Sequence, residues 1–326
     1  MKKRLLRSLT AIAALFLLIS GTYVAAQNSE SGGSGIQISP TRTEVSLDKG
    51  ASKDVTITVK NITPGPIVAR AYLHDFESDD ETGEPRLIVD PKETSAYSLR
   101  RFVKNLNDVN LNSGETKTVT FSLVAPADAS PGAYFGAVRF AAIPQGSDNR
   151  QEEPQVGLTA SVAHLLLVTV PGDVQVGAKL EKVGVERNGK SASIFIQPPL
   201  TGFVRVNNTG NGFIKPFGKV VVSKGGKEVY SYELNNRTPR SNVLPKSSRT
   251  FKDPIRNVSS FGRYTITANV SHTDGGEVIS MSKSFWVIPV WLLVILAALL
   301  GAIFLTIFLW NKRAHRYRIK IRRKKK

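Results

Sequence analysis

An uncharged apolar segment near the C terminus constrains this chain more than any other feature. It runs from Trp286 to Trp310 (WVIPVWLLVILAALLGAIFLTIFLW) and holds 25 residues. A helix of that length covers roughly 37 Å, against ~30 Å of bilayer hydrocarbon, so it can cross a membrane with some tilt. A buried core helix this long would carry a polar stripe, which this segment lacks. We therefore expect a transmembrane helix over residues 285–310.

The segment after the apolar run predicts the orientation in the membrane. Ten of the fifteen residues of Lys312–Lys326 (KRAHRYRIKIRRKKK) are Lys or Arg, and none is acidic. Such a cluster stays on the cytoplasmic side, so residues 311–326 are predicted to be a cytoplasmic tail. The tail could also lie along anionic inner-leaflet lipids, at ~1 kcal/mol per basic residue, although a simple stop-transfer anchor is the preferred interpretation.

The first 26 residues have the pattern of a secretory signal peptide. The basic start MKKRLLR is followed by the apolar run Leu9–Ile19 and by the small residues Ala25 and Ala26. An uncleaved anchor is the alternative. Residues 27–35 (QNSESGGSG) are a polar, flexible leader. The expected product is a single-pass plasma-membrane protein of bacterial type, with its N-terminal domains extracellular at the cell surface.

The high net charge of +18 does not indicate a nucleic-acid-binding protein. Without the ten cations of the tail and the four near the N terminus, 30 cations face 26 acidic residues, a balance of +4. The basicity therefore reports membrane topology, and nucleic acid is not an expected partner. The chain has no cysteine. Without disulfides or thiolate metal sites, the outer domains need hydrophobic cores of their own.

The extracellular part is patterned for strands. Apolar residues alternate with polar ones over Val55–Val59 and again over Tyr264–Val270. Glycine pairs at Lys224–Lys227 and Asp274–Glu277 are hairpin signals. We therefore predict an all-β fold of two tandem immunoglobulin-like antiparallel β-sandwiches, plus one C-terminal transmembrane α-helix. The sandwiches would cover residues 36–173 and 174–284.

Two segments of the first sandwich depart from simple alternation. Thr94–Leu106 (TSAYSLRRFVKNL) places its large apolar residues on one helical face, so it is predicted to be the one helix of the extracellular part. The glycines of Pro131–Phe140 (PGAYFGAVRF) predict a bulge or a close approach of two backbones.

Candidate metal ligands cluster in one acidic loop, Asp75–Pro85 (DFESDDETGEP). Its acidic residues supply oxygens of the kind that Ca²⁺ binds: Asp75, Asp79, Asp80, Glu81 and Glu84. Their spacing does not match an EF-hand loop, so a solvated hairpin tip is the preferred interpretation. His164 lies alone on an apolar strand and is expected to be a packed core residue.

No catalytic pattern emerges from the sequence. The four histidines are scattered, and the chain has no HExxH, GxSxG or phosphate-loop motif. We therefore predict a protein without cofactor and without enzymatic activity. A cell-wall enzyme with an unrecognised site is the less favoured alternative.

The order of motifs over residues 36–170 resembles a known family. The run ISPTRTEVSLDKGASKDVTIT (Ile38–Thr58), the acidic loop, SLRRFVKN and VNLNSGETKTVTFSLVAPADASPGAYFGAVRF (Val109–Phe140) are similar to the N-terminal sandwich of the WxL-interacting cell-surface proteins of Gram-positive bacteria. The resemblance implies a signal peptide, two sandwiches, one C-terminal span and a short basic tail. It also implies that the first sandwich binds peptidoglycan and that the second binds a partner or host ligand.

Together these observations predict a membrane-anchored bacterial surface protein that binds rather than catalyses. Its sandwiches would bind cell wall (peptidoglycan) or another surface protein, with addition of a strand to a sheet edge as one available mechanism. The alternative is a structural or sensory stalk that spaces or reports without binding the wall.

Overall fold

The structure is a computed structural model that describes residues 35–79, 81–90, 92–146, 160–196, 198–258, 261–273 and 275–323. The predicted signal peptide lies outside these residues, as does the leader up to residue 34. The described part folds into four β-sheets, which form two sandwiches, and into one C-terminal helix, α2 (Val290–Arg323). The predicted fold class is confirmed.

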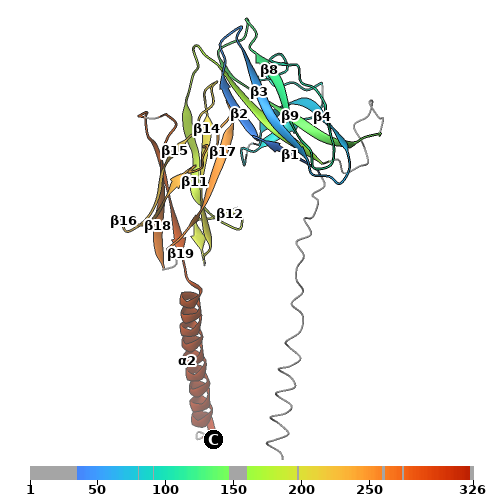
Figure 1. Ribbon diagram of the computed structural model, residues 1–326. Helices are drawn as coiled ribbons and strands as arrows, with labels where there is room; N and C mark the ends of the chain where they lie inside the picture. Colours follow the sequence, from blue (N-terminus) through green and yellow to red (C-terminus); the bar gives the residue numbers. More distant parts are fainter. Residues whose placement is uncertain are drawn as a thin grey trace, which may run out of the picture.

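The first sandwich pairs a four-stranded sheet with a six-stranded sheet (Figure 1). The smaller sheet has the order β1 (Ile36–Ser39), β3 (Ser52–Asn61), β8 (Thr116–Val124), β6 (Val103–Lys104). The larger sheet has the order β2 (Arg42–Ser46), β10 (Ser161–Val170), β9 (Gly132–Pro144), β4 (Ile67–Ser78), β5 (Pro85–Ile88), and β7 (Val109–Leu111) also pairs with β4.

The second sandwich repeats this plan. One sheet has the order β12 (Lys190–Ser191), β11 (Ala178–Arg187), β14 (Leu200–Asn208), β17 (Ser248–Ile255). The other has the order β13 (Ile194–Phe195), β19 (Ile279–Val287), β18 (Gly262–Ser271), β15 (Phe217–Lys224), β16 (Lys227–Leu234). In each sandwich the last strand pairs in parallel with a short early strand, β10 with β2 and β19 with β13.

The strands follow the alternation seen in the sequence. In β3, Val55, Ile57 and Val59 are buried and face the opposing sheet, while the residues between them face outward. The Lys224–Lys227 turn joins β15 to β16, as predicted. Gly225 and Gly226 both adopt positive φ there (56° and 80°), as a two-residue hairpin turn of this kind requires.

The predicted helix over 94–106 is wrong. The segment forms turns followed by the short strand β6, and Asn105 has a positive φ of 59°. Leu99 and Phe102 are buried, as a helical face would have them, but they enter the core from a turn. A helix this short is marginal by itself, so local side-chain hydrogen bonds and packing decide the conformation.

The glycines of the PGAYFG run allow neighbouring backbone segments to approach β9 closely. The β9 ladders show no register shift, so the alternative of a bulge does not occur. A Cβ on Gly136 would lie 3.3 Å from the His74 carbonyl oxygen, and one on Gly132 would lie 3.2 Å from the Asn211 carbonyl oxygen. Asn211 belongs to the second sandwich, so Gly132 lets the two sandwiches touch through their backbones.

The apolar helix starts later than the sequence pattern suggests. Phe285 and Trp286 are still part of β19, where they pair with Tyr264 and Arg263, and α2 begins at Val290. Strand pairing takes the first residues of the apolar run, because Phe285 and Val287 complete the core of the second sandwich. Val290–Lys312 contains an 18-residue window with a mean hydropathy of 3.0, and the stretch is long and apolar enough to cross a membrane.

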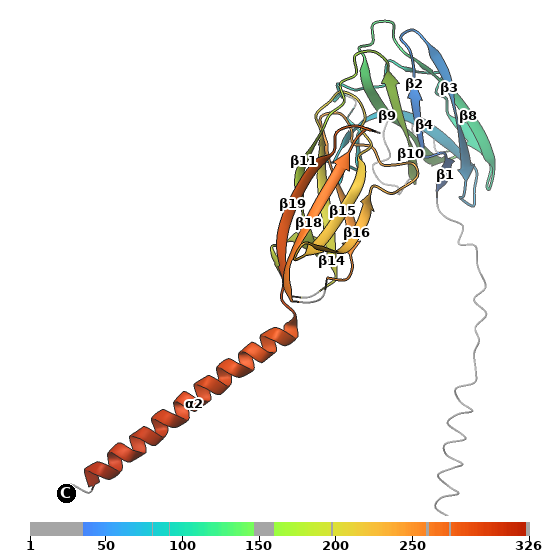
Figure 2. The same cartoon turned by 90° about the vertical axis from the view of Figure 1, so that its left-hand side faces the viewer.

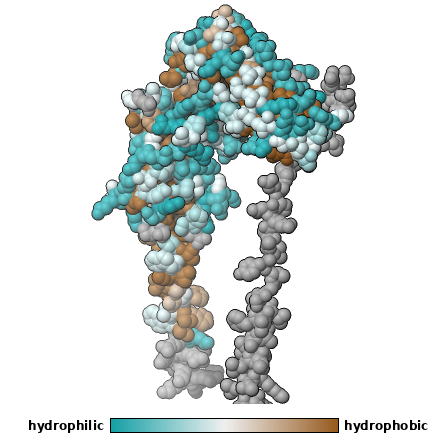
Figure 3. Space-filling view, viewed as in Figure 1, coloured by the Kyte–Doolittle hydropathy of each residue, from teal (hydrophilic) through white to brown (hydrophobic). Residues whose placement is uncertain are grey.

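The second sandwich stands between α2 and the first sandwich, which lies across its far end (Figures 1 and 2). Each sandwich has its own buried core, and neither core includes a residue of α2. The helix projects away from both sandwiches as an apolar rod (Figure 3).

Candidate functional site in the cleft between the sandwiches

A third apolar cluster lies where the two sandwiches meet. Phe135 of β9 is its centre: it stacks on Tyr97 at 5.3 Å between ring centroids and contacts Phe76 at 5.0 Å. The second sandwich contributes Phe213, 6.1 Å from Phe135, and the buried Leu244. The sandwiches are therefore held together by a small core and not by a linker alone.

Glu44 of β2 is the polar centre of the same junction. Its carboxylate accepts a hydrogen bond from Lys215 Nζ at 2.5 Å and one from Asn242 Nδ2 at 2.9 Å, both from the second sandwich. Arg42 of its own strand lies 3.2 Å away. Partial burial raises the pKa of Glu44, but the hydrogen bonds and charges of these neighbours outweigh it and lower the pKa overall. Glu44 thus stays ionised and ties the sandwiches together.

Hydrogen bonds to backbone carbonyls fix the junction at two further points. Ala133 N–H donates to the Asn211 carbonyl at 2.9 Å, next to Gly132. Arg249 of β17 donates to the Gly83 carbonyl at 3.2 Å. Contacts on several sides of an apolar centre therefore hold the two sandwiches at a fixed angle. We call this bent arrangement of the two sandwiches the braced elbow.

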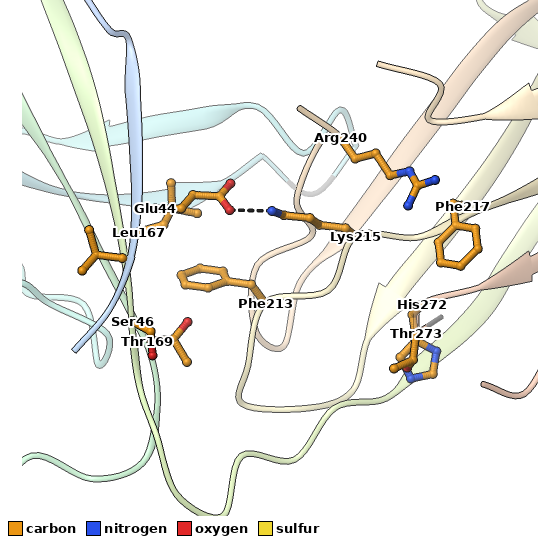
Figure 4. A pocket seen from close by; sticks show the side chains of 11 residues that line it. Glu44, Ser46, Leu167, Thr169, Phe213, Lys215, Phe217, Arg240, His272 and Thr273 are labelled. Carbon is orange, nitrogen blue, oxygen red and sulfur yellow. Dashed lines mark hydrogen bonds and ion pairs between the residues drawn. The ribbon is translucent and has the colours of Figure 1, made fainter. Parts of the chain in front are cut away.

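Beside this junction the elbow leaves an open cleft of about 490 Å³ (Figure 4). One wall comes from β2 and β10, and the other comes from the second sandwich. The lining residues are Glu44, Val45, Ser46, Leu167, Thr169, Phe213, Lys215, Phe217, Arg240, His272 and Thr273.

Two polar groups in the cleft have no hydrogen-bond or ion-pair partner within the described part of the chain. The Arg240 guanidinium stacks over the Phe217 ring at 4.4 Å from its centroid, and it forms no ion pair there. His272 Nδ1 is buried and makes no hydrogen bond. A stacked guanidinium is pre-oriented and keeps its donors available, so Arg240 is suited to hold a carboxylate. The cleft has the chemistry of an anion-binding site with apolar walls.

The described members of the predicted calcium ligands form no metal site. Asp75 is a buried residue of β4, where it accepts a hydrogen bond from Ser98 Oγ at 2.7 Å and pairs with Arg100 at 3.3 Å. Asp79 accepts hydrogen bonds from Thr82 and from Glu81 N–H within its own turn. Glu81 and Glu84 follow in the same turn, and Asp80 lies outside the described residues. Across the described residues, no group of three acidic or histidine side chains could hold a metal ion.

His164 is the packed core residue that its apolar strand predicts. It is fully buried in β10, and its Nδ1 lies 2.7 Å from the Pro40 carbonyl oxygen. It therefore takes no part in the cleft.

The sequence pattern did not reveal the cleft residues. Glu44, Lys215, Arg240 and His272 come from four separate segments, and Glu44 and Lys215 are 171 positions apart. No local spacing marks them. Only the pairing of the two sandwiches brings them together.

Comparison with known proteins adds little to this geometry. No protein-family model and no curated protein matches the sequence. Among solved structures, the class 5 fimbriae chaperone CfaA is similar at 13% identity and a TM-score of 0.37, over 77% of this chain and 99% of that one. The CupB2 chaperone of Pseudomonas aeruginosa is similar at 14% identity and a TM-score of 0.32, over 76% and 99%. The CsuC–CsuE pre-assembly complex of Acinetobacter baumannii gives 11% identity and 0.36, over 78% and 98%. Likenesses of this strength do not indicate what this chain binds.

Proposed function

We propose that this chain is a membrane-anchored surface protein that binds cell-wall peptidoglycan, without catalysing a reaction, in the cleft between its sandwiches. The observation that carries the proposal is the pair of unpartnered groups in that cleft, the stacked Arg240 guanidinium and the buried His272 Nδ1. The guanidinium can bond to an anionic group that enters between the apolar walls of Phe213 and Phe217, and His272 lines the same cleft.

The anchor supports the location. β19 is followed directly by an apolar helix, so the second sandwich would stand on the membrane with the cleft beyond it. The basic residues after Trp310 favour a cytoplasmic tail and an extracellular elbow. A protein held at the outer face of a plasma membrane has the wall within reach.

The chemistry of the wall supports the ligand. Peptidoglycan stem peptides carry carboxylates beside small apolar side chains, which match a cationic group between aromatic walls. The resemblance of residues 36–170 to the WxL-interacting proteins also favours peptidoglycan. In this proposal the second sandwich contributes to the same site, because Arg240 and His272 belong to it.

A stalk that only spaces or reports is the second candidate, and the braced elbow favours it. Contacts through Glu44, Phe213 and Asn211 would keep the two sandwiches at a fixed angle whether or not a ligand is bound.

Co-sedimentation with insoluble peptidoglycan separates the two functions. The protein to use is fragment 27–288, which holds all three apolar cores and lacks the basic tail. We expect saturable binding that persists at about 0.3 M salt, where unspecific surface attraction is screened. Arg240→Ala should weaken it about tenfold, because a charge-assisted hydrogen bond is worth ~1.5–3 kcal/mol.

Arg256→Ala is the matched control, since Arg256 is exposed in the segment after β17 and does not line the cleft. It should bind like the unmodified fragment. Binding that is absent or that vanishes at moderate salt would exclude wall binding and leave the stalk. Binding that is equally strong in Arg240→Ala would exclude the cleft as the site.

A further inference from the structure

The outer edge of β19 is open over most of its length. β13 covers this edge only at Trp286 and Val287, where two residues pair. Among the described residues, nothing pairs with the same edge from Ile279 to Phe285. The sheet order places β18 on the opposite side, so one side of β19 is exposed as a strand edge.

The open backbone groups belong to three serines. Trp286 N–H donates outward to the Ser193 carbonyl, and Ile288 N–H donates outward to the Phe195 carbonyl, each at 2.8 Å. Successive residues of a strand direct their backbone groups to opposite sides. Ser280, Ser282 and Ser284 therefore direct their N–H and C=O groups to the same outer edge. Their short side chains leave that edge accessible.

The first sandwich shows what this position accommodates. There β2 pairs in parallel with β10 over five residues, from Arg42 opposite Leu165 to Ser46 opposite Thr169. β13 is the equivalent of β2, yet it supplies only two such pairs. The second sandwich thus lacks most of a strand that the first one has.

A groove beside this edge carries uncompensated positive charge. It has a volume of about 530 Å³ and is lined by β11, β14, β17 and Met281–Lys283 of β19. Two of its acidic residues already form ion pairs, Glu181 with Arg205 and Glu186 with Lys252.

Lys182 and Lys283 have no acidic partner within the described residues. Glu81, from the first sandwich, is the single further acid in the lining. A strand on the edge of β19 would direct every second side chain toward these lysines.

A second copy of this chain does not complement the site, because its own β19 edge over Ile279–Phe285 (ISMSKSF) carries a lysine and no acidic residue. Two β19 edges that pair antiparallel run in opposite directions, and each leads directly into its own α2. Copies anchored in one membrane would then have their helices on opposite sides of the pair. The open segment begins roughly 17 Å and ends roughly 37 Å above the start of α2, at ~3.4 Å per residue. An occupant must therefore be another chain that reaches this height.

We propose that the open edge of β19, with Lys182 and Lys283 beside it, binds an extended, acidic segment of a partner protein as an added β-strand. The backbone of Ser280, Ser282 and Ser284 provides the hydrogen bonds, and the two lysines select for alternating acidic side chains. This site is separate from the cleft and does not depend on the proposed binding of peptidoglycan.

Three fluorescein-labelled peptides test the proposal on fragment 27–288, which lacks the basic tail: acetyl-TETETETE-amide, the lysine counterpart TKTKTKTK and the neutral TSTSTSTS. Fluorescence anisotropy should show binding of the acidic peptide, with the basic one at least about tenfold weaker. Hydrogen exchange should slow at the amides of Ser280, Ser282 and Ser284 when the acidic peptide is added.

Two variants address the two parts of the site. Ser282→Pro removes an outward N–H at a sheet edge, where proline is tolerated, and should weaken the acidic peptide about tenfold. Lys182→Glu with Lys283→Glu should weaken it at least as much and leave the sheet unchanged. Lys227→Glu, in the exposed hairpin turn, controls for the reversal of a lysine charge away from the edge and should have no effect. No binding of the acidic peptide, equal binding of the basic one, or unchanged binding in both variants would overturn the proposal.

Discussion

The fully buried His164 couples the stability of the first sandwich to pH. Burial lowers the pKa of His164, although the hydrogen bond to the Pro40 carbonyl opposes this. The folded state then binds fewer protons than the unfolded state near and below the ordinary histidine pKa of ~6.5. We expect the free energy of unfolding to fall as the pH drops from 7 to 5. Urea titrations at three pH values would measure this. His164→Asn keeps a donor for Pro40 but cannot titrate, so its stability should change less over this range; an identical pH dependence would contradict the assignment.

The sequence predicts the burial of individual residues, but it does not predict a site that several distant residues form together. An isolated histidine on an apolar strand, such as His164, reads as buried because its neighbours in the strand are apolar. Arg240 and His272 carry no comparable local signal. Their role depends on the fact that Phe217 lies beneath the guanidinium and that β2 forms the facing wall.

At the scale of elements, the segment 94–106 shows how side-chain hydrogen bonds replace a helix. Ser98 Oγ donates to the buried Asp75 at 2.7 Å and accepts from Arg100 N–H at 3.2 Å. Ser98→Ala should lower the free energy of unfolding by about 1–3 kcal/mol, because it leaves a buried acceptor with one donor fewer. Ser122→Ala removes the same kind of bond, Ser122 Oγ to Asp54 at 2.7 Å, on an exposed face. In urea denaturation this control should stay within about 0.5 kcal/mol of the unmodified protein. Equal losses would show that the burial of Asp75 does not matter.

Strands and their turns were predictable because their signals are local. Alternation over β3 and β18 reports one buried face, and the glycine pair before β16 reports the hairpin. Leu99 and Phe102 also reported their burial correctly. Their helical spacing wrongly predicted a helix. A turn forms there instead, because Ser98 bonds to Asp75 and the strand β6 follows.

At the scale of the molecule, the chain builds one plan twice. In each sandwich the last strand lies between a short parallel strand and the strand that precedes it in the chain, so the strand order is the same. The two sandwiches differ at the edge of this last strand. β2 pairs with β10 over five residues, whereas β13 pairs with β19 over only two, and the proposed partner strand would bind at that open edge. The repeat is one of topology, which sequence similarity over short segments does not reveal.

The junction between the two sandwiches should make them unfold together. Phe213 fills the apolar cluster from one side, and Glu44 holds Lys215 and Asn242 beside it. In calorimetry of fragment 27–288 we expect one transition. Phe213→Ala with Glu44→Gln should split it into two, since inter-domain contacts of this size are the main coupling between separate cores. Phe213 is only partly buried, so its share of the cost is about 1–3 kcal/mol, below the ~3–5 kcal/mol of a fully buried phenylalanine. Phe261→Ala is the control, because Phe261 is 47% exposed on the second sandwich, outside the junction. A single transition that persists in the double variant would mean that the hydrogen bonds to the Asn211 and Gly83 carbonyls hold the two sandwiches together instead.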